Sequence, residues 1–306
     1  MEPNFFDVIV VGGSFAGLSA ALQVARARQR VLVIDAGQPR NRFSTNAHGF
    51  LGRDGESPAE ILRSGKAELL RYPTVSFVEG KAVHAHRDSD KRFSIALDSG
   101  EVYQGDRLIL ALGVVDRLPE IPGVAEHWGK TVAHCPYCHG YELPAGRWGV
   151  LKTFEGSFHQ AKLLLDWNDD VIFLTNGYSL SAEERDALTA SGIESEEQPI
   201  ASFTGNNDKI SGAKLQNGRM IDLEALFIAS QFSIGTSLAT QLGCELTDSA
   251  LGIIIKTDSL KKETSIPGVF AAGDCSRPAH NISWAVADGA AAGIFAHQSL
   301  VAARAA

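Results

Sequence analysis

The stretch FDVIVVGGSFAG, residues 6–17, gives the clearest indication of the fold. Residues 6–11 are apolar, rich in β-branched side chains and of strand length, which predicts a buried strand. An Ala- and Leu-rich helix is expected over 18–27, and a second strand over 30–34 that ends at Asp35. A strand, a glycine-rich turn, a helix and a strand closed by an acid together indicate a dinucleotide-binding βαβ unit.

Each residue type in this turn has a physical role. Gly12 permits the tight turn, and Gly17 lets the helix pack closely on the strand. Ser14 stands where a second glycine is usual; it is small and can donate a hydrogen bond, so the site should survive the change. Asp35 is placed to accept hydrogen bonds from ribose hydroxyls. The expected nucleotide-binding residues of this unit are Gly12, Gly13, Ser14, Phe15, Ala16, Gly17, Asp35 and Ala36.

Bulk properties argue against several classes of protein. With 306 residues and 44% hydrophobic content, the chain is long enough for two domains with cores of their own. A net charge of −8 without a Lys/Arg cluster argues against nucleic acid as a partner. No apolar run approaches the ~18 residues of a transmembrane helix, and we expect no signal peptide and no membrane. Four cysteines do not make a disulfide framework, so we expect a cytoplasmic protein.

The second chemical motif is CPYCH, residues 135–139. A Cys-x-x-Cys pair can be a redox dithiol, half of a zinc site or, with the trailing His, a haem attachment sequence. No second Cys/His pair lies at zinc-finger spacing, and covalent haem attachment would call for export. We favour a redox pair at a helix start, where the helix N-terminus stabilises a thiolate. We therefore expect no metal, and we interpret Cys244 and Cys275 as buried packing residues.

Several side chains near these motifs have both a functional and a structural interpretation. His139 follows the second cysteine, and imidazole titrates near neutral pH, so we predict a general acid/base rather than a packing residue. His134 is a weaker candidate for the same role. His48 and Trp284 have structural interpretations as a surface histidine and a packed tryptophan.

A second βαβ pattern spans residues 147–174. Here Lys152 and Phe154 occupy the first two glycine positions, and Ser157 occupies the third. A phenylalanine side chain would block the backbone approach to a pyrophosphate, and neither an acid nor an arginine follows the second strand. We predict that this repeat does not bind a pyridine nucleotide in the usual way.

Four segments occur together in the order of a known family. They are Gly12–Gly17, Ala111–Gly113, Cys135–Cys138 and Thr264–Asp274. Over essentially its whole length the chain resembles the low-molecular-weight thioredoxin reductases of the pyridine nucleotide–disulfide oxidoreductase superfamily. The resemblance implies an α/β fold of two Rossmann-like three-layer domains, the second inserted into the first, in a homodimer that binds FAD. It also implies that Cys138 faces the flavin and that Cys135 exchanges with the substrate.

The same resemblance extends the set of expected FAD-binding residues beyond the first turn. Asp274 would contact the ribityl-phosphate region of the cofactor. The further expected residues are Arg42, His48, Ala82, Val83, Ala111, Leu112, Gly113, Gly273, Asp274, Ser283, Trp284 and Ala285.

Three departures from the family pattern indicate that the chain resembles a particular subgroup of the family. The NADPH motif is degenerate, His139 replaces the acid after the second cysteine, and Ser283-Trp284 replace an Arg-Gln pair. Residues 134–142 and 41–55 are more similar to dithiol oxidases of the gliotoxin and holomycin type. The lost nucleotide motif is similar to that of deeply rooted and ferredoxin-linked reductases, which do not use NADPH.

The sequence therefore predicts an FAD-binding domain formed by residues 1–117 and 246–306, and an inserted domain, 118–245, that carries the cysteine pair. We expect a thiol–disulfide oxidoreductase that does not depend on NADPH, with Cys135, Cys138 and His139 as its catalytic residues. Its partner would be a thioredoxin-like protein or a small dithiol, and ferredoxin or another donor could supply electrons. The alternatives are a dithiol oxidase that uses oxygen and a flavin-binding redox sensor without turnover.

Overall fold

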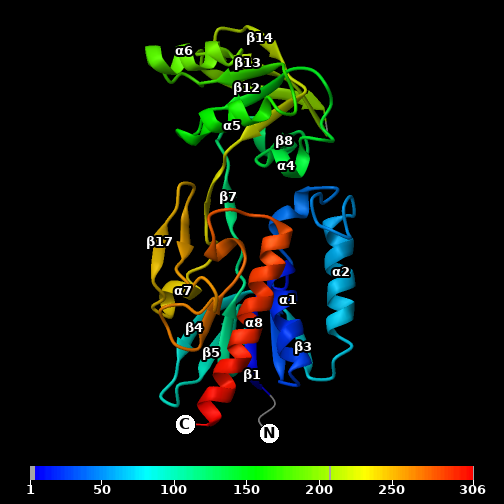
Figure 1. The fold of residues 1–306 in the computed structure, drawn as a ribbon, viewed down its shortest axis with the longest axis vertical. Coiled ribbons are helices and arrows are strands. Elements are labelled where there is room, and N and C mark those ends of the chain that lie inside the picture. Colours follow the sequence, from blue (N-terminus) through cyan, green and yellow to red (C-terminus); the bar gives the residue numbers. More distant parts are fainter. Residues whose placement is uncertain (1–3, 207, 306) are drawn as a thin grey trace. The chain divides into compact units, whose positions relative to one another are not determined.

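The computed structural model describes residues 4–206 and 208–305, and the chain in it folds as two compact units (Figure 1). The first unit comprises residues 4–42, 58–115 and 232–305, and the second comprises 43–57 and 116–231. This division differs from the expected one in three places. Residues 232–245 belong to the first unit, whereas the loop 43–57 and residues 116–117 belong to the second.

Local contacts explain the two larger differences. Gln241, on helix α7 (Leu238–Gln241), accepts a 2.8 Å hydrogen bond from the backbone N–H of Ala85 in the first unit. Leu238 of the same helix packs in the core of that unit. In the second unit, Ser44 lies within hydrogen-bonding distance of His139, so the loop 43–57 is held against the segment that carries the cysteines.

The first unit is built on a sheet with strand order β3-β2-β1-β6-β5-β4, and β19 also pairs with β6. The strands β1, β2, β3, β6 and β19 run parallel, whereas β4 and β5 continue the sheet in antiparallel fashion. The bounds are β1 (Phe5–Val11), β2 (Val31–Asp35), β3 (Val75–Glu79), β4 (Ala82–Arg87), β5 (Phe93–Leu97), β6 (Val102–Leu110) and β19 (Val269–Ala271).

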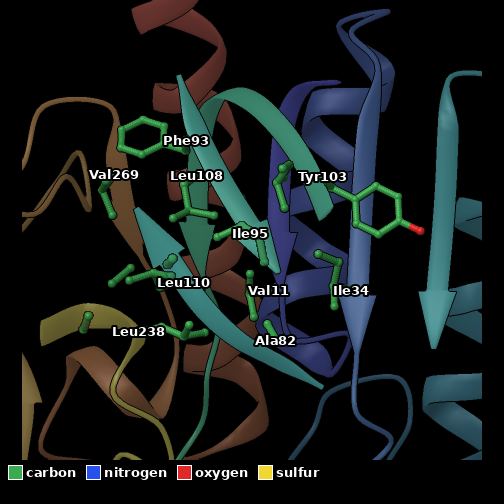
Figure 2. Packing of buried hydrophobic residues seen from close by; sticks show 14 of the residues in the cluster. Val11, Ile34, Ala82, Phe93, Ile95, Tyr103, Leu108, Leu110, Leu238 and Val269 are labelled. Carbon is green, nitrogen blue, oxygen red and sulfur yellow. The ribbon is translucent and has the colours of Figure 1, made fainter. Parts of the chain in front are cut away.

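Successive side chains of the buried parallel strands point to opposite faces of the sheet, and each face has its own hydrophobic core. Ile9 and Val11 of β1 belong to a hydrophobic cluster that also contains residues of β4, β5 and α7. Figure 2 shows this cluster and labels Phe93, Leu108 and Leu238 among its members. Val8 and Val10 point to the other face and pack with the long helices α1 (Phe15–Arg26) and α8 (Ile282–Arg304). The sheet is therefore covered on both faces, as expected for an α/β unit.

Small residues bring α1 and α8 into close contact. A Cβ atom on Gly289 would collide with the carbonyl of Ala16, and one on Gly293 would collide with the carbonyl of Ala20. The remaining elements of this unit are α2 (Pro58–Leu69), α7 (Leu238–Gln241), β17 (Leu246–Asp248), β18 (Ile253–Ile255) and η2 (Asp274–Ser276).

The second unit contains a parallel sheet with strand order β11-β10-β9-β15-β8 and a separate antiparallel sheet, β12-β13-β14. The helix α5 follows β9, as the second βαβ pattern predicts, and the two-domain α/β fold class is confirmed. The strands are β8 (Val132–Ala133), β9 (Trp148–Leu151), β10 (Val171–Leu174), β11 (Glu194–Glu196), β12 (Ile200–Asn206), β13 (Lys209–Leu215), β14 (Met220–Asp222) and β15 (Ala225–Ile228). The helices are α3 (Val124–His127), α4 (Pro136–His139), α5 (Gly156–Leu164) and α6 (Ala182–Ala190).

Three short elements lie where the chain passes between the units: η1 (Arg40–Phe43), β7 (Val115–Arg117) and β16 (Gln231–Ser233). The strands β7 and β16 pair with each other. In the part of the chain that the structure describes, no helix combines the length and apolar character needed to cross a membrane.

Candidate active site

The glycine turn after β1 has a geometry that only glycine allows. Gly12 has a φ of +106°, a backbone conformation that side chains rarely adopt. A Cβ atom on Gly12 would collide with the carbonyl of Ala111, and one on Gly17 would collide with the carbonyl of Gly12. The turn is therefore drawn in tightly against β6, and α1 starts directly behind it.

The N-terminus of α1 is open to an anion. Ser14 is the N-cap residue, yet its side chain makes no capping hydrogen bond, and the first turn contains no acidic residue. A helix N-terminus with uncapped amides carries a partial positive charge and favours a phosphate group. The expected residues Phe15 and Ala16 lie in this first turn, so their backbone faces the site that a pyrophosphate would take.

Asp35 lies beside the turn at the end of β2. Its Oδ1 accepts a 3.0 Å hydrogen bond from the backbone N–H of Gly13. Its carbonyl accepts a 2.9 Å hydrogen bond from Gly80, which brings the start of β4, with Ala82 and Val83, toward the same sheet edge. Because parallel strands present their carboxyl ends at one edge, these residues meet where a nucleotide binds in such sheets.

Three further expected segments converge on the same edge. A Cβ atom on Gly273 would lie 2.9 Å from that of Ala16 and 3.8 Å from that of Ala285. The start of α1, the Gly273-Asp274 turn and the start of α8 are therefore neighbours. Gly113, with a φ of +62°, turns the chain away just after β6 ends.

Arg40 belongs to this edge although the sequence analysis does not single it out. Its guanidinium lies 3.2 Å from the carboxylate of Asp274 and 2.7 Å from Nδ1 of His280. The side chain of Arg40 is only 15% exposed, so the ion pair with Asp274 is strongly shielded from water. The neighbouring Arg42, which is an expected residue, donates a 3.0 Å hydrogen bond to the carbonyl of Pro39.

Trp284 lies at the start of α8, where the guanidinium of Arg277 stacks on its ring at 4.6 Å. Arg277 also pairs with the buried carboxylate of Asp288 at 3.2 Å. Trp284 is 42% exposed, so it is only partly packed at the start of α8. Asn281 caps the helix by accepting a 2.7 Å hydrogen bond from the backbone N–H of Trp284.

Cys135 and Cys138 form a disulfide in the second unit, with 5.3 Å between their Cα atoms. Cys135 is the N-cap residue of the single-turn helix α4, which continues from Pro136 to His139. A disulfide in this turn agrees with the redox interpretation of the motif. In the described residues no group of three His, Cys, Asp or Glu side chains is placed to hold a metal ion.

His139 packs against the disulfide turn. Its Nδ1 lies 3.4 Å from the carbonyl of Cys135, and its Nε2 lies 3.5 Å from the hydroxyl of Ser44. A ring nitrogen that faces a carbonyl carries the hydrogen, which leaves Nε2 as the basic atom. Burial lowers the pKa of His139, the hydrogen bond to Cys135 raises it, His48 lowers it further and Glu142 raises it. The net effect is a lowered pKa, which favours the neutral imidazole that can accept a proton.

His48 belongs to the second unit, where it lies beside Glu142, close to the cysteine turn. Its Nδ1 lies 3.4 Å from the carboxylate of Glu142 and 3.7 Å from that of Asp54. The loop 43–57 thus contributes Ser44 and His48 to the surroundings of His139. His134, the other histidine candidate, stacks on Trp128 with ring centroids 5.9 Å apart.

The remaining two thiols are buried and lie in the first unit. The Cys275 Sγ donates toward the carbonyls of Leu110 and Ala272, and burial raises its pKa to about 12. Burial also raises the pKa of Cys244. A thiol must ionise to exchange, so both behave as packing residues.

The second glycine-type turn is closed by its own side chains. A Cβ atom on Gly156, the first residue of α5, would collide with the ring of Phe154. The buried hydroxyl of Ser157 accepts a 3.1 Å hydrogen bond from the backbone N–H of Thr153. Lys152 lies between the rings of Phe158 and Tyr178, 5.3 and 5.4 Å from their centroids. The Phe154 ring thus lies against the first residue of α5, and the Ser157 hydroxyl bonds the backbone of the preceding turn.

An open dinucleotide turn in one unit and a redox-type disulfide in another define the class of flavin-linked disulfide oxidoreductases. The chain belongs to the pyridine nucleotide-disulphide oxidoreductase family, which matches residues 6–152 and 157–291. It is 32% identical to thioredoxin reductase tcpT from Claviceps purpurea (strain 20.1), over 98% of this chain and 95% of the relative.

Solved structures agree with this assignment. The oxidoreductase from Agrobacterium tumefaciens is 43% identical, with a TM-score of 0.91 over 97% of this chain and 98% of that chain. The putative thioredoxin reductase TrxB from Bacillus anthracis is 30% identical, with a TM-score of 0.92 over 98% of this chain and 99% of that chain. The chain is therefore a thioredoxin reductase-like disulfide oxidoreductase, and its cofactor is FAD.

The residues of the first unit fit this cofactor. A Cβ on Gly12 or Gly17 would collide with neighbouring backbone carbonyls, so these glycines let the turn pack tightly between β6 and α1, and the uncapped start of α1 suits a pyrophosphate. Asp35 offers a carboxylate for ribose hydroxyls, and the shielded pair of Arg40 and Asp274 balances charge nearby.

Proposed function

We propose that this enzyme passes electrons between FAD and a dithiol or disulfide substrate through Cys135 and Cys138, without NADPH or NADH as the donor. The substrate is a thioredoxin-like protein or a small dithiol. Thioredoxin reductases among the relatives support the first choice, and the similarity of residues 134–142 to dithiol oxidases supports the second.

The closure of the second glycine-type turn by Phe154 is the observation that carries the proposal. In a dinucleotide-binding turn the glycines exist so that the backbone can approach the phosphates. Here the Phe154 ring stands against Gly156, and Ser157 already accepts a hydrogen bond from Thr153. A pyridine nucleotide would have to displace a packed ring before its pyrophosphate reached the amides of α5.

The proposed chemistry at the cysteines is thiol–disulfide exchange. A substrate thiolate attacks one sulfur of the disulfide, a mixed disulfide forms, and the second substrate thiol resolves it. We assign Cys135 to this exchange and Cys138 to electron transfer with the flavin, which accepts or supplies two electrons. The Nε2 of His139, neutral because burial lowers its pKa, accepts the proton of the attacking thiol.

The proposal assigns the cofactor to the first unit and the substrate-reactive cysteines to the second. The FAD-binding set keeps the expected residues of the first unit and gains Arg40, because that side chain pairs with Asp274. His48 stays in the proposed FAD-binding set, and its contact with Glu142 also places it among the surroundings of His139. The proposal also includes a homodimer, on the basis of the family resemblance, and a cytoplasmic location, on the basis of the cysteine usage. Sedimentation of the purified protein tests the dimer.

A second candidate function is a dithiol oxidase that uses oxygen. The same closed turn favours it, because an enzyme without a nicotinamide donor can take its electrons from the dithiol substrate. Reduced flavin would then return two electrons to oxygen. In the opposite direction, reduced ferredoxin or a similar protein would supply the electrons for disulfide reduction.

One anaerobic titration tests the proposal. Flavin absorbance is followed while NADPH, NADH, reduced ferredoxin and dithiothreitol are added in separate experiments. We expect bleaching by dithiothreitol and none within a second by submillimolar NADPH or NADH. Cys135→Ser should abolish the dithiothreitol reaction while leaving FAD bound, and Cys244→Ala, at a buried thiol, should leave it intact. Rapid bleaching by NADPH would contradict the proposal, and oxygen consumption with the dithiol would establish the oxidase direction.

A further inference from the structure

Gln160 lies on α5, directly behind the disulfide turn. Its side chain is buried, with 8% of the residue exposed. Its Nε2 donates a 2.8 Å hydrogen bond to the carbonyl of His134, the residue before Cys135. Only the nitrogen end of the amide can donate to a carbonyl, so this bond fixes the orientation of the amide. The other end, Oε1, is buried and accepts no hydrogen bond from the described residues.

Trp167, which follows α5, supports the other end of the same turn. Its ring meets that of Tyr137 edge-on, with centroids 5.1 Å apart. A Cβ atom on Gly140 would lie 2.9 Å from Cδ1 of Trp167. The disulfide turn is therefore held at both ends by α5 and the residues after it. The Nε2 end of the Gln160 amide is part of this support, because it bonds the carbonyl of His134, the residue before Cys135.

A buried amide oxygen without a donor costs free energy, and such an atom in a native structure calls for an explanation. The oxidised cysteine pair has no hydrogen to offer, whereas each reduced cysteine has an S–H donor. We propose that Oε1 of Gln160 accepts a hydrogen bond from a thiol of the reduced pair, so that Gln160 stabilises the dithiol relative to the disulfide.

This inference rests on the proposed dithiol exchange and adds a positioning residue to it. In the exchange, two substrate S–H bonds break and one substrate S–S bond forms. The Cys135–Cys138 bond breaks, and the cysteines gain the two electrons and two protons that the substrate loses. Gln160 transfers nothing itself. It shifts the equilibrium of the exchange toward the reduced enzyme, which makes the pair a stronger oxidant of dithiols.

The test is the equilibrium between the pair and mixtures of reduced and oxidised dithiothreitol. After alkylation, mass spectrometry of the 135–138 peptide gives the reduced fraction without reference to the flavin. Gln160→Met keeps the length of the side chain and removes both polar ends. We expect the equilibrium constant for reduction to fall about three- to tenfold, where tenfold corresponds to about 30 mV.

Two further variants separate this role from simple support of the turn. Gln160→Glu keeps an acceptor but loses the donor to His134, so its equilibrium constant should stay above that of Gln160→Met. Gln241→Met is the matched control, because the Gln241 amide in the first unit bonds Ala85 and Ser237 and lies on α7. It should leave the equilibrium unchanged.

Two results would overturn the inference: an unchanged constant in a folded Gln160→Met protein, or equal constants in the Met and Glu variants. A different result is that dithiothreitol does not reduce the Cys135–Cys138 disulfide of the wild type at all. The proposed function would then be wrong, and so would the inference that rests on it.

Discussion

The ring of Phe154 stands against Gly156, so that even a Cβ atom on that glycine would collide with it. Gly156 begins α5, the helix that corresponds in layout to α1 of the first unit. Neither helix start has a side-chain cap or an acid in its first turn, but at the start of α5 the Phe154 ring packs on Gly156. The chain therefore contains two βαβ turns, and we propose that only the first admits a pyrophosphate.

Replacing Phe154 should reopen the second turn in part. Phe154→Gly removes the ring and restores a glycine at the second motif position, so the affinity for NADPH should rise by about tenfold, or ~1.4 kcal/mol. Lys152 still replaces the first glycine, so binding should remain weaker than in an intact turn. Fluorescence titration with NADPH measures the change. An affinity equal to that of the wild type would show that the ring is not what excludes the nucleotide.

The first turn should tolerate no added methyl group. In Gly17→Ala the new Cβ meets the carbonyl of Gly12, which belongs to the rigid turn. We expect FAD affinity to fall on the order of a hundredfold, about 2.7 kcal/mol, measured as FAD retained after gel filtration and by titration of the apoprotein.

A second glycine substitution provides the control for this loss. A Cβ on Gly65, inside α2, would lie 3.4 Å from Leu18, an ordinary contact. Gly65→Ala should retain FAD and stabilise the fold by about 0.5–1 kcal/mol, because alanine favours a helix interior. Equal loss of FAD in the two variants would argue against a specific role for the turn.

Arg40 should support FAD binding through Asp274. Without Arg40, the carboxylate of Asp274 keeps its charge beside the site that the cofactor's phosphates occupy in our proposal. We expect Arg40→Ala to weaken FAD by roughly tenfold, and the loss should be larger at low salt. Arg53→Ala is the matched control, since that arginine pairs with Glu56 in the second unit and should leave FAD binding unchanged. Unchanged affinity in Arg40→Ala would exclude this role.

His139 should set the pH dependence of exchange. Because burial lowers its pKa from the ordinary value of 6.5, the neutral base persists below pH 6.5. The wild-type rate should therefore decline only as the pH falls through the lowered pKa. In His139→Ala we expect an exchange rate about a hundredfold lower than that of the wild type. The decline at low pH should be absent, and FAD should still be bound. Stopped-flow exchange with dithiothreitol from pH 5 to 9 measures both effects.

The same shift predicts how stability changes with pH. The folded pKa lies below the unfolded one, so the unfolded chain binds more protons between the two values. The free energy of unfolding should fall as the pH drops through that window, and His139→Ala should remove part of the fall. His84→Ala, at an exposed site on β4, should change neither the rate nor this pH dependence. If the exchange rate and the stability of His139→Ala depend on pH as those of the wild type do, the imidazole is a packing group.

Much of the fold could be predicted from the sequence because its signals are local. The β-branched runs and the spacing of Gly12, Gly17 and Asp35 specify a strand, a turn and a helix within about thirty residues. The same spacing in residues 147–174, with Phe154 in a glycine position, predicted a second unit with a blocked turn. The elements expected over 6–11, 18–27 and 30–34 are β1, α1 and β2, and their ends lie within three residues of the expected ones.

The unit boundaries could not be predicted with the same success, because they depend on contacts distant in the chain. Nothing in residues 43–57 indicates that the loop joins the cysteine unit, which follows from contacts such as that of Ser44 with His139. The pairing of Arg40 with Asp274 spans 234 residues, and no local pattern encodes such a separation.

The sequence by itself thus determined the fold class, the open first turn, the degenerate second turn and the cysteine pair, because each depends on residue types at short spacing. Only the tertiary structure decided which side chains surround those motifs. It placed Arg40 on Asp274, His48 beside Glu142, and the amide of Gln160 behind the disulfide turn. These are contacts of packed elements, and burial and distance, which fix their energies, exist only once the chain has folded.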